Sequence, residues 1–228
     1  MFYDMSISSK YNKNDLVFLE DSDYSGFCFT YSISQNDISK FTRPSPPSLP
    51  SKKSFIKLSV NLLTHSYNTK SLFSKCDVLC LTVPDFETPV DENMCDVILL
   101  DMTKPLKFRN INPNIFYEVD ILSALYDKRD RMMWLYNFRE LIRVTKCRNI
   151  IVGSAATRST EVKSPLDIMK MLLVVDIGED KARQILRNNE KCLEKCAERR
   201  FMKNECVFDD IPEGALKEEF LINKFKQN

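Results

Sequence analysis

The chain of 228 residues contains a single histidine, and this scarcity limits the chemistry it can perform. His65 follows a predicted strand in the run Leu-Leu-Thr-His-Ser-Tyr, and no nucleophile motif accompanies it. A site that needs two or more imidazoles, such as a multi-histidine metal cluster, is therefore excluded. A catalytic triad is recognised by geometry rather than by sequence, so a triad built on His65 stays open. We prefer to interpret His65 as a surface or capping residue.

Glycines and acids are the other residue types that could bind a phosphate or a metal. The four glycines assemble neither a GxGxxG nor a GxxxxGK[ST] phosphate loop. Acids near predicted strand ends leave a carboxylate-bound magnesium site open, namely Asp77, Asp96, Asp101, Glu118 and Asp120. Acids also commonly cap strand ends, and nothing arranges these five into a pair. We therefore predict no catalytic residue, no metal ligand and no cofactor.

The eight cysteines lie mostly within apolar runs, and no CxxC pair occurs. The N-terminus has an early acid and no basic segment, so it does not resemble a signal peptide. No run approaches the roughly 18 apolar residues of a membrane span. We expect a soluble intracellular protein with reduced, buried thiols. Zinc held by the pairs Cys76/Cys80 and Cys192/Cys196 is a disfavoured alternative.

Basic side chains provide the positive evidence for function. They concentrate around two predicted strand–helix junctions, at Lys128, Arg129, Arg131, Arg139, Arg143, Lys146, Arg148, Arg158 and Lys163. Clustered cations on a rigid scaffold are typical of binding to a phosphate backbone. Few aromatic residues lie among them, which favours shape-based contact with structured RNA over base stacking. The alternative is ordinary solvated surface charge.

Seven short apolar runs predict strands, at Phe2–Ile7, Gly26–Ile33, Phe55–Leu63, Val78–Val83, Val97–Leu100, Phe116–Ile121 and Asn149–Gly153. Several are almost continuously apolar, as expected for strands that are covered on both faces. Strands that alternate with helices favour a parallel sheet. We predict an α/β fold, a small or incomplete (β/α) barrel with about seven strands. A doubly wound sheet is the alternative.

The predicted helices lie mainly in the second half of the chain. A helix over Arg131–Cys147 has an apolar face, with Trp134 and Phe138, and a basic face with Arg139, Arg143 and Lys146. Ser164-Pro165 predicts a second helix start. A third helix begins near Gly178, and a break at Asn188-Asn189 separates it from a fourth over Glu190–Arg200.

One segment resembles a known family. The run from Arg148 to Leu172 is similar to the hallmark of the thirty-kilodalton protein subunit of eukaryotic and archaeal ribonuclease P and MRP. That hallmark is a strand ending in Ser-Ser/Gly-Ala, a basic residue, Glu-Ile-Arg and a Gly-Pro-Tyr-Asp helix start. The matching residues here are Ser154, Ala155, Ala156, Arg158, Glu161, Pro165 and Asp167. The specific likeness covers about residues 115–200, so Arg200 joins the candidate RNA-binding residues.

This resemblance implies a TIM-barrel-like domain over residues 1–204, with a Pro/Ser-rich loop at 41–54, and an acidic, then helical tail over 205–228. The family is related to metal-dependent phosphoesterase barrels but lacks their metal site. It implies a non-catalytic subunit that binds ribonuclease P RNA, and MRP RNA as a further candidate, for 5′-leader removal from precursor tRNA. A small ferredoxin-like subunit is the implied protein partner, and the nucleus, with its nucleolus, the implied location.

Two other functions stay open at this point. One is a divergent barrel phosphoesterase or nuclease with carboxylate-bound metal. The other is a protein-interaction scaffold without RNA contact.

Overall fold

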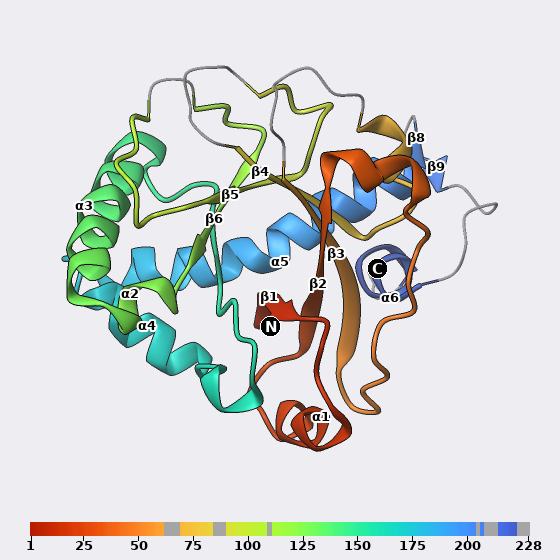
Figure 1. Ribbon diagram of the computed structural model, residues 1–228, viewed down its shortest axis with the longest axis horizontal. Coiled ribbons are helices and arrows are strands. Elements are labelled where there is room, and N and C mark those ends of the chain that lie inside the picture. Colours follow the sequence, from red (N-terminus) through yellow and green to blue (C-terminus); the bar gives the residue numbers. More distant parts are fainter. Residues whose placement is uncertain (62–68, 84–89, 109–110, 204–205, 208–213, 223–228) are drawn as a thin grey trace.

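The computed structural model describes residues 1–61, 69–83, 90–108, 111–203, 206–207 and 214–222. Their central element is one sheet of seven parallel strands (Figure 1), with the bounds β1 Tyr3–Ser8, β2 Gly26–Ser34, β3 Lys53–Asn61, β4 Val78–Thr82, β5 Val97–Leu100, β6 Phe116–Asp120 and β7 Ile150–Gly153. Their spatial order follows the chain without reversal. A doubly wound sheet reverses its strand order at a switch point. The observed order therefore excludes that alternative and confirms the prediction of a barrel.

The barrel closes where β1 meets the end of β7. The Ser8 amide donates to the Ala156 carbonyl at 2.8 Å, and the Ser154 amide donates to Asp4 Oδ1 at 3.0 Å. Gly153 makes this approach feasible, because a Cβ there would lie 2.7 Å from the Cβ of Ser6. Closure extends only along this part of the two strands.

The remaining gap between β1 and β7 is bridged by a helix. Asn189 of α5 (Glu179–Phe201) accepts a hydrogen bond from the Val152 amide at 3.1 Å. Its Nδ2 donates to the carbonyls of Tyr3 and Val152, at 2.7 and 2.8 Å. One buried amide thus satisfies edge groups of both strands, so the result is a nearly closed barrel.

The helices other than α5 differ in size and position. They are α1 Lys13–Glu20, α2 Ser123–Tyr126, α3 Lys128–Thr145, α4 Pro165–Leu173 and α6 Ala215–Lys217. Short 3₁₀ turns occupy Gln35–Lys40, Lys70–Leu72 and Ser159–Glu161, a π turn follows α6 at Glu218–Ile222, and β8 Met202–Lys203 pairs with β9 Cys206–Val207. Among the described helices, none combines the length and apolar character that a membrane span requires.

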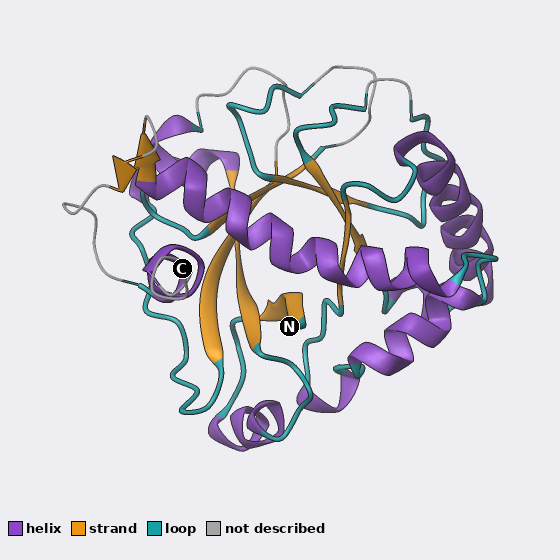
Figure 2. Cartoon of the chain, turned by 180° about the vertical axis from the view of Figure 1, so that it is seen from behind, coloured by secondary structure: helices purple, strands orange, loops and turns teal. Residues whose placement is uncertain are grey.

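Two predicted helix boundaries were wrong. The helix expected from Arg131 begins at Lys128, because Asp127 caps it by accepting from the amides of Arg129 and Asp130. The break expected at Asn188-Asn189 does not occur, and α5 is one helix (Figure 2). Both asparagines are buried and use their side chains on the barrel backbone, with Asn188 donating to the carbonyls of Cys147 and Ile150 at 2.9 Å. Asparagine pairs often interrupt helices, but here the two side chains attach α5 to the backbone of the barrel.

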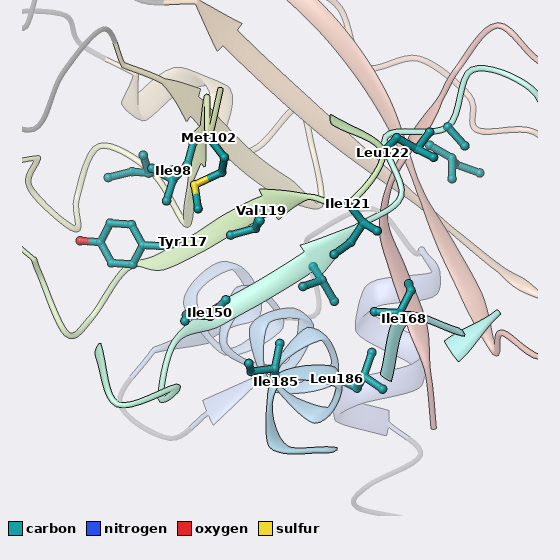
Figure 3. Close-up of a cluster of buried hydrophobic side chains, with 14 of the residues drawn as sticks. Ile98, Met102, Tyr117, Val119, Ile121, Leu122, Ile150, Ile168, Ile185 and Leu186 are labelled. Atoms are coloured by element: carbon teal, nitrogen blue, oxygen red, sulfur yellow. The ribbon is translucent and has the colours of Figure 1, made fainter. Parts of the chain in front are cut away.

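Apolar residues form two cores, one on each face of the barrel wall. The outer core lies between the strands and the surrounding helices, and Figure 3 shows part of it, including Ile98, Tyr117, Val119, Ile168 and Ile185. The inner core fills the barrel and its N-terminal end, with members Met5, Cys28, Phe55, Cys80, Phe116, Ile151, Cys192 and Cys196 among others. The seven cysteines other than Cys206 are buried and free, in agreement with the expected reduced thiols.

The C-terminal helical segment contributes to the inner core. Leu216, Phe220 and Leu221 are buried there, and the Phe220 ring lies 5.7 Å from that of Tyr3 and 6.1 Å from that of Phe55, between ring centroids. The expected helix in this part of the chain is present at Ala215–Ile222. The domain boundary at residue 204 stays a prediction.

Candidate nucleic-acid interface

The acids that could have bound a metal are engaged by the fold. Asp77 and Asp96 each stand in a Cys-Asp-Val run just before a strand, and each accepts an amide of the preceding strand at 2.8 Å. Arg43 pairs with Asp77 at 2.7 Å, and Arg199 and Arg200 pair with Asp96 at 2.8 and 2.6 Å. These two carboxylates therefore tie neighbouring strands together at the N-terminal end of the barrel.

Glu118 lies inside the barrel against a lysine. The Lys57 ammonium bonds to Glu118 Oε2 and donates to the Met5 carbonyl at 3.1 Å, and both side chains are 1% exposed. Burial alone would lower the pKa of Lys57, but Glu118 outweighs it and the pKa is raised. The buried ammonium of Lys57 opposes binding of a metal cation beside Glu118.

Asp4 lies in β1 and Asp120 at the end of β6. Burial raises the pKa of each to about 6. Asp4 accepts the amides of Ser6 and Ser154, and Asp120 accepts the amide of Leu122 at 2.7 Å. One oxygen of each carboxylate therefore accepts backbone amides nearby, while Asp4 Oδ2 has no hydrogen-bond partner among the described residues.

The described ranges contain no group of three or more His, Cys, Asp or Glu residues placed to hold a metal ion. Asp101 is exposed in a turn, where it bonds to Thr103 and Lys104. Cys76 belongs to the outer core and Cys80 to the inner core, so the two do not form a pair. His65 lies outside the described residues. Asp77, Asp96 and Glu118 thus serve as hydrogen-bond and ion-pair partners within the fold.

Helix α3 presents two contrasting faces. Trp134, Phe138 and Leu141 are buried on its inner face, and the Trp134 and Phe138 rings pack at 4.7 Å between centroids. The indole of Trp134 donates to the Asp120 carbonyl at 2.8 Å. Asn137 fixes the inner face further by donating to the Met102 and Lys104 carbonyls. The periodicity predicted from the sequence is confirmed.

The outer face of α3 is the candidate interface. Its exposed cations are Lys128, Arg129, Arg139, Arg143 and Lys146. Met132 and Tyr136 lie on the same face, 63% and 62% exposed, and neither is among the predicted binding residues. The two residues are four positions apart, and this spacing already indicates that they share one face of the helix. We call these seven residues the outer face of α3.

Acidic neighbours engage only part of this face. Arg139 pairs with Asp176 at 2.9 Å and Arg143 with Glu140 at 2.8 Å, in exposed contacts that solvent screens. Within the described residues, Lys128, Arg129 and Lys146 form no ion pair. The guanidinium of Arg131, beside this face, donates to the Ala124 and Leu125 carbonyls and so caps the end of α2.

Arg158 and Lys163 lie elsewhere. They belong to the segment between β7 and α4, which packs beside α1, where Ser159 Oγ donates to Asp15 Oδ1 at 2.7 Å. The Lys163 carbonyl accepts from Tyr24 at 2.8 Å. Figure 1 places this segment next to α1, with the length of α4 between it and α3. The structure therefore divides the predicted basic residues into two separate groups.

Arg200 stands apart from both groups. Its side chain is 5% exposed, and it donates to the Cys76 carbonyl at 2.9 Å besides pairing with Asp96. Burial alone would lower the pKa of Arg200, but the neighbouring Asp96 carboxylate has the larger opposite effect. The pKa is therefore raised, and the guanidinium stays charged. The side chain holds the barrel together, and we leave it out of the RNA interface proposed below. From the sequence alone, Arg200 could not be distinguished from the exposed arginines of α3.

The family of the chain follows from its similarity to known proteins. A sequence profile described as RNase P subunit p30 matches residues 1–201. The chain belongs to this family. The p30-family chain is also similar to the protein GAMETOPHYTE DEFECTIVE 1 of Arabidopsis thaliana, at 24% identity over 112 residues. That match covers 46% of this chain and 19% of the plant protein, so the chain spans about a fifth of that relative's length.

A solved structure shares the fold. A chain in a cryo-EM structure of archaeal ribonuclease P with mature tRNA superposes with a TM-score of 0.63 at 14% sequence identity. The superposition covers 92% of the p30-family chain and 99% of the archaeal chain. At this identity the likeness concerns the barrel architecture.

Proposed function

We propose that this p30-family chain is a non-catalytic, RNA-binding subunit of the ribonuclease P ribonucleoprotein. In that particle it supports removal of the 5′ leader from precursor tRNA while the RNA performs the chemistry. Family membership over residues 1–201 supports the particle. The engagement of Asp77, Asp96 and Glu118 in strand contacts and ion pairs supports the absence of a catalytic role.

The observation that carries the RNA contact is the outer face of α3. An 18-residue helix is about 27 Å long, so its five exposed cations can follow several successive phosphates. The inner face fixes the helix rigidly on the barrel through Trp134, Phe138 and Asn137. Rigid presentation suits structured RNA, which proteins recognise largely by shape and backbone.

We extend the proposal to a second contact at Arg158 and Lys163. Both residues lie on a segment that is fixed by the Ser159–Asp15 bond and by the capped start of α4 at Ser164 and Pro165. The proposed partners are ribonuclease P RNA, with MRP RNA as a second RNA, and a small ferredoxin-like subunit. The proposed location is the nucleus, including the nucleolus.

The RNA contact is tested with the triple variant Arg139→Gln, Arg143→Gln and Lys146→Gln. Binding to ribonuclease P RNA is measured across a salt titration, and we expect weaker binding and a salt slope lowered by about two to three. The matched control is Lys40→Gln, Arg187→Gln and Lys191→Gln, which removes three exposed cations away from α3. Equal effects of the two triples would show that α3 contributes only net charge.

The non-catalytic role is tested on the isolated protein. With Mg²⁺ or Mn²⁺ present, we expect no cleavage of precursor tRNA and no phosphoesterase activity. Metal-dependent cleavage that disappears in His65→Ala would overturn the proposal and restore the hydrolase alternative.

A further inference from the structure

A pocket of ≈ 630 Å³ lies at the N-terminal end of the barrel, beside Cys76 and Asp77, which precede β4, and beside the end of α5. Its size is within the range of roughly 300–1,000 Å³ that is typical of small-ligand sites. Among the described residues, its wall includes four basic side chains, Arg43, Lys70, Arg199 and Arg200, and one acid, Asp77. The wall is therefore positively charged, and none of its residues belongs to the outer face of α3.

In the ion pairs of this wall, the arginine is more exposed than the carboxylate that it contacts. Asp77 is 5% exposed beneath Arg43, which is 36% exposed, and Asp96 is 4% exposed beneath Arg199, which is 26% exposed. The carboxylates are thus covered while the guanidinium groups reach the pocket. Among the described residues, Arg43 uses one of its five donors, on Asp77, and the Nε and Nη2 donors of Arg199 make no hydrogen bond. Donors remain for an incoming anion.

Each of the arginines is held in position before any ligand arrives. Arg199 and Arg200 both lie over the ring of Phe73, with guanidinium carbons 5.7 and 5.2 Å from the ring centroid. Arg43 precedes Pro44 in the Pro/Ser-rich loop, whose Phe41 carbonyl accepts a hydrogen bond from Lys75 at 2.7 Å. Such fixed guanidinium groups suit the multidentate recognition of a phosphate.

We propose that this pocket binds a phosphate group carried by RNA, as a contact separate from α3. The inference rests on the proposed function for the identity of the ligand, whereas the pocket and its charge stand independently. Phosphate is favoured over a carboxylate because the guanidinium groups of Arg43 and Arg199 both reach the pocket, and phosphate offers more acceptor oxygens. The Pro/Ser-rich loop then acts as a rigid support for Arg43.

The test uses the full chain and a short RNA. A fluorescent hexaribonucleotide is titrated at low salt onto the wild type, Arg43→Gln and, as a matched control, Arg187→Gln, whose exposed arginine lies outside this pocket. We expect Arg43→Gln to raise the Kd about tenfold, as for loss of a charge-assisted hydrogen bond. Arg43→Lys keeps the charge and the partner Asp77, so it should retain most of the binding.

Two further arms make the result decisive. The same titration on the triple α3 variant separates the two surfaces, because the pocket should still bind there even if α3 proves to have no RNA contact. An acidic hexapeptide of equal charge competes for the pocket, and stronger binding of the peptide than of the RNA would overturn the assignment. An equal Kd for Arg43→Gln and Arg187→Gln, with both variants folded by their melting temperatures, would overturn it too.

Discussion

Helices α3 and α5 are the two longest of the described helices, and both are rich in cations, yet α3 and the C-terminal part of α5 use these cations in opposite ways. In α5, Arg187 and Lys191 are exposed, but three cations further along the helix turn toward the barrel. Lys195, Arg199 and Arg200 donate to the carbonyls of Asn114, Cys95 and Cys76, which lie just before β6, β5 and β4. In α3 the cations turn toward solvent, and the inner face is neutral.

The difference follows from what each helix covers. The wall beneath α3 consists of apolar residues and a few carbonyls, which Trp134 and Asn137 satisfy without charge. The strand starts beneath α5 expose carbonyls and the buried carboxylate of Asp96, which require donors. A lysine or arginine is therefore informative about RNA only once its acceptors are known.

The largest expected effect concerns the buried cation of α5. Replacing Arg200 with alanine leaves Asp96 short of a partner, so we expect the free energy of unfolding to fall by about 3–5 kcal/mol, as when one partner of a buried ion pair is removed. Denaturant titration measures this loss. The control Lys128→Ala changes an exposed cation of α3 and should stay within about 0.5 kcal/mol. Similar losses in the two variants would remove the contrast between the helices.

A smaller loss is expected for the bridge between β1 and β7. Asn189→Ala removes three hydrogen bonds and leaves buried backbone groups of Tyr3 and Val152 without partners, which should cost about 1–3 kcal/mol. Hydrogen exchange of the Val152 amide should rise together with this loss. The exposed Asn36 serves as the control, because Asn36→Ala removes an asparagine without touching the barrel. Unchanged protection of Val152 would mean that the strands close the gap without the helix.

The sequence predicted the elements that depend on local pattern. Apolar runs located the seven strands of the barrel sheet, although not β8 and β9, and the 3.6-residue period assigned the inner and outer faces of α3. It failed where a side chain acts across the barrel. Asn188 and Asn189 were interpreted as a helix break because their acceptors lie in β7 and β1, far away in the chain. Arg200 was grouped with surface cations for the same reason.

The interior of the barrel illustrates the same limit. Lys57 stands in the run Ser-Phe-Ile-Lys-Leu-Ser-Val, where a lysine inside an apolar strand is itself a signal of a buried partner. The partner, Glu118, is 61 residues away and becomes visible only when β3 and β6 face each other across the barrel. The repeated Cys-Asp-Val runs at 76–78 and 95–97 were a second signal, since both precede strands and both place an acid at the same position.

The smallest expected effect on stability belongs to the outer face of α3. The triple change of Arg139, Arg143 and Lys146 to glutamine should leave the melting temperature nearly unchanged, because the pairs with Asp176 and Glu140 are exposed and screened. A competing role exists for two of these residues. Arg143 and Lys146 lie at the C-terminal end of the helix, where cations oppose the negative end of the helix dipole.

Salt separates the two roles. If the cations mainly stabilise the end of the helix, the triple variant should melt several degrees below the wild type at low salt, and the difference should shrink at about 1 M salt because charges are then screened within roughly 3 Å. If they mainly contact RNA, the two proteins should melt together at every salt concentration, while RNA binding differs. A low-salt melting defect with normal RNA binding would place α3 beside α5 as a structural user of its cations. The contrast between the two helices would then be one of exposure alone.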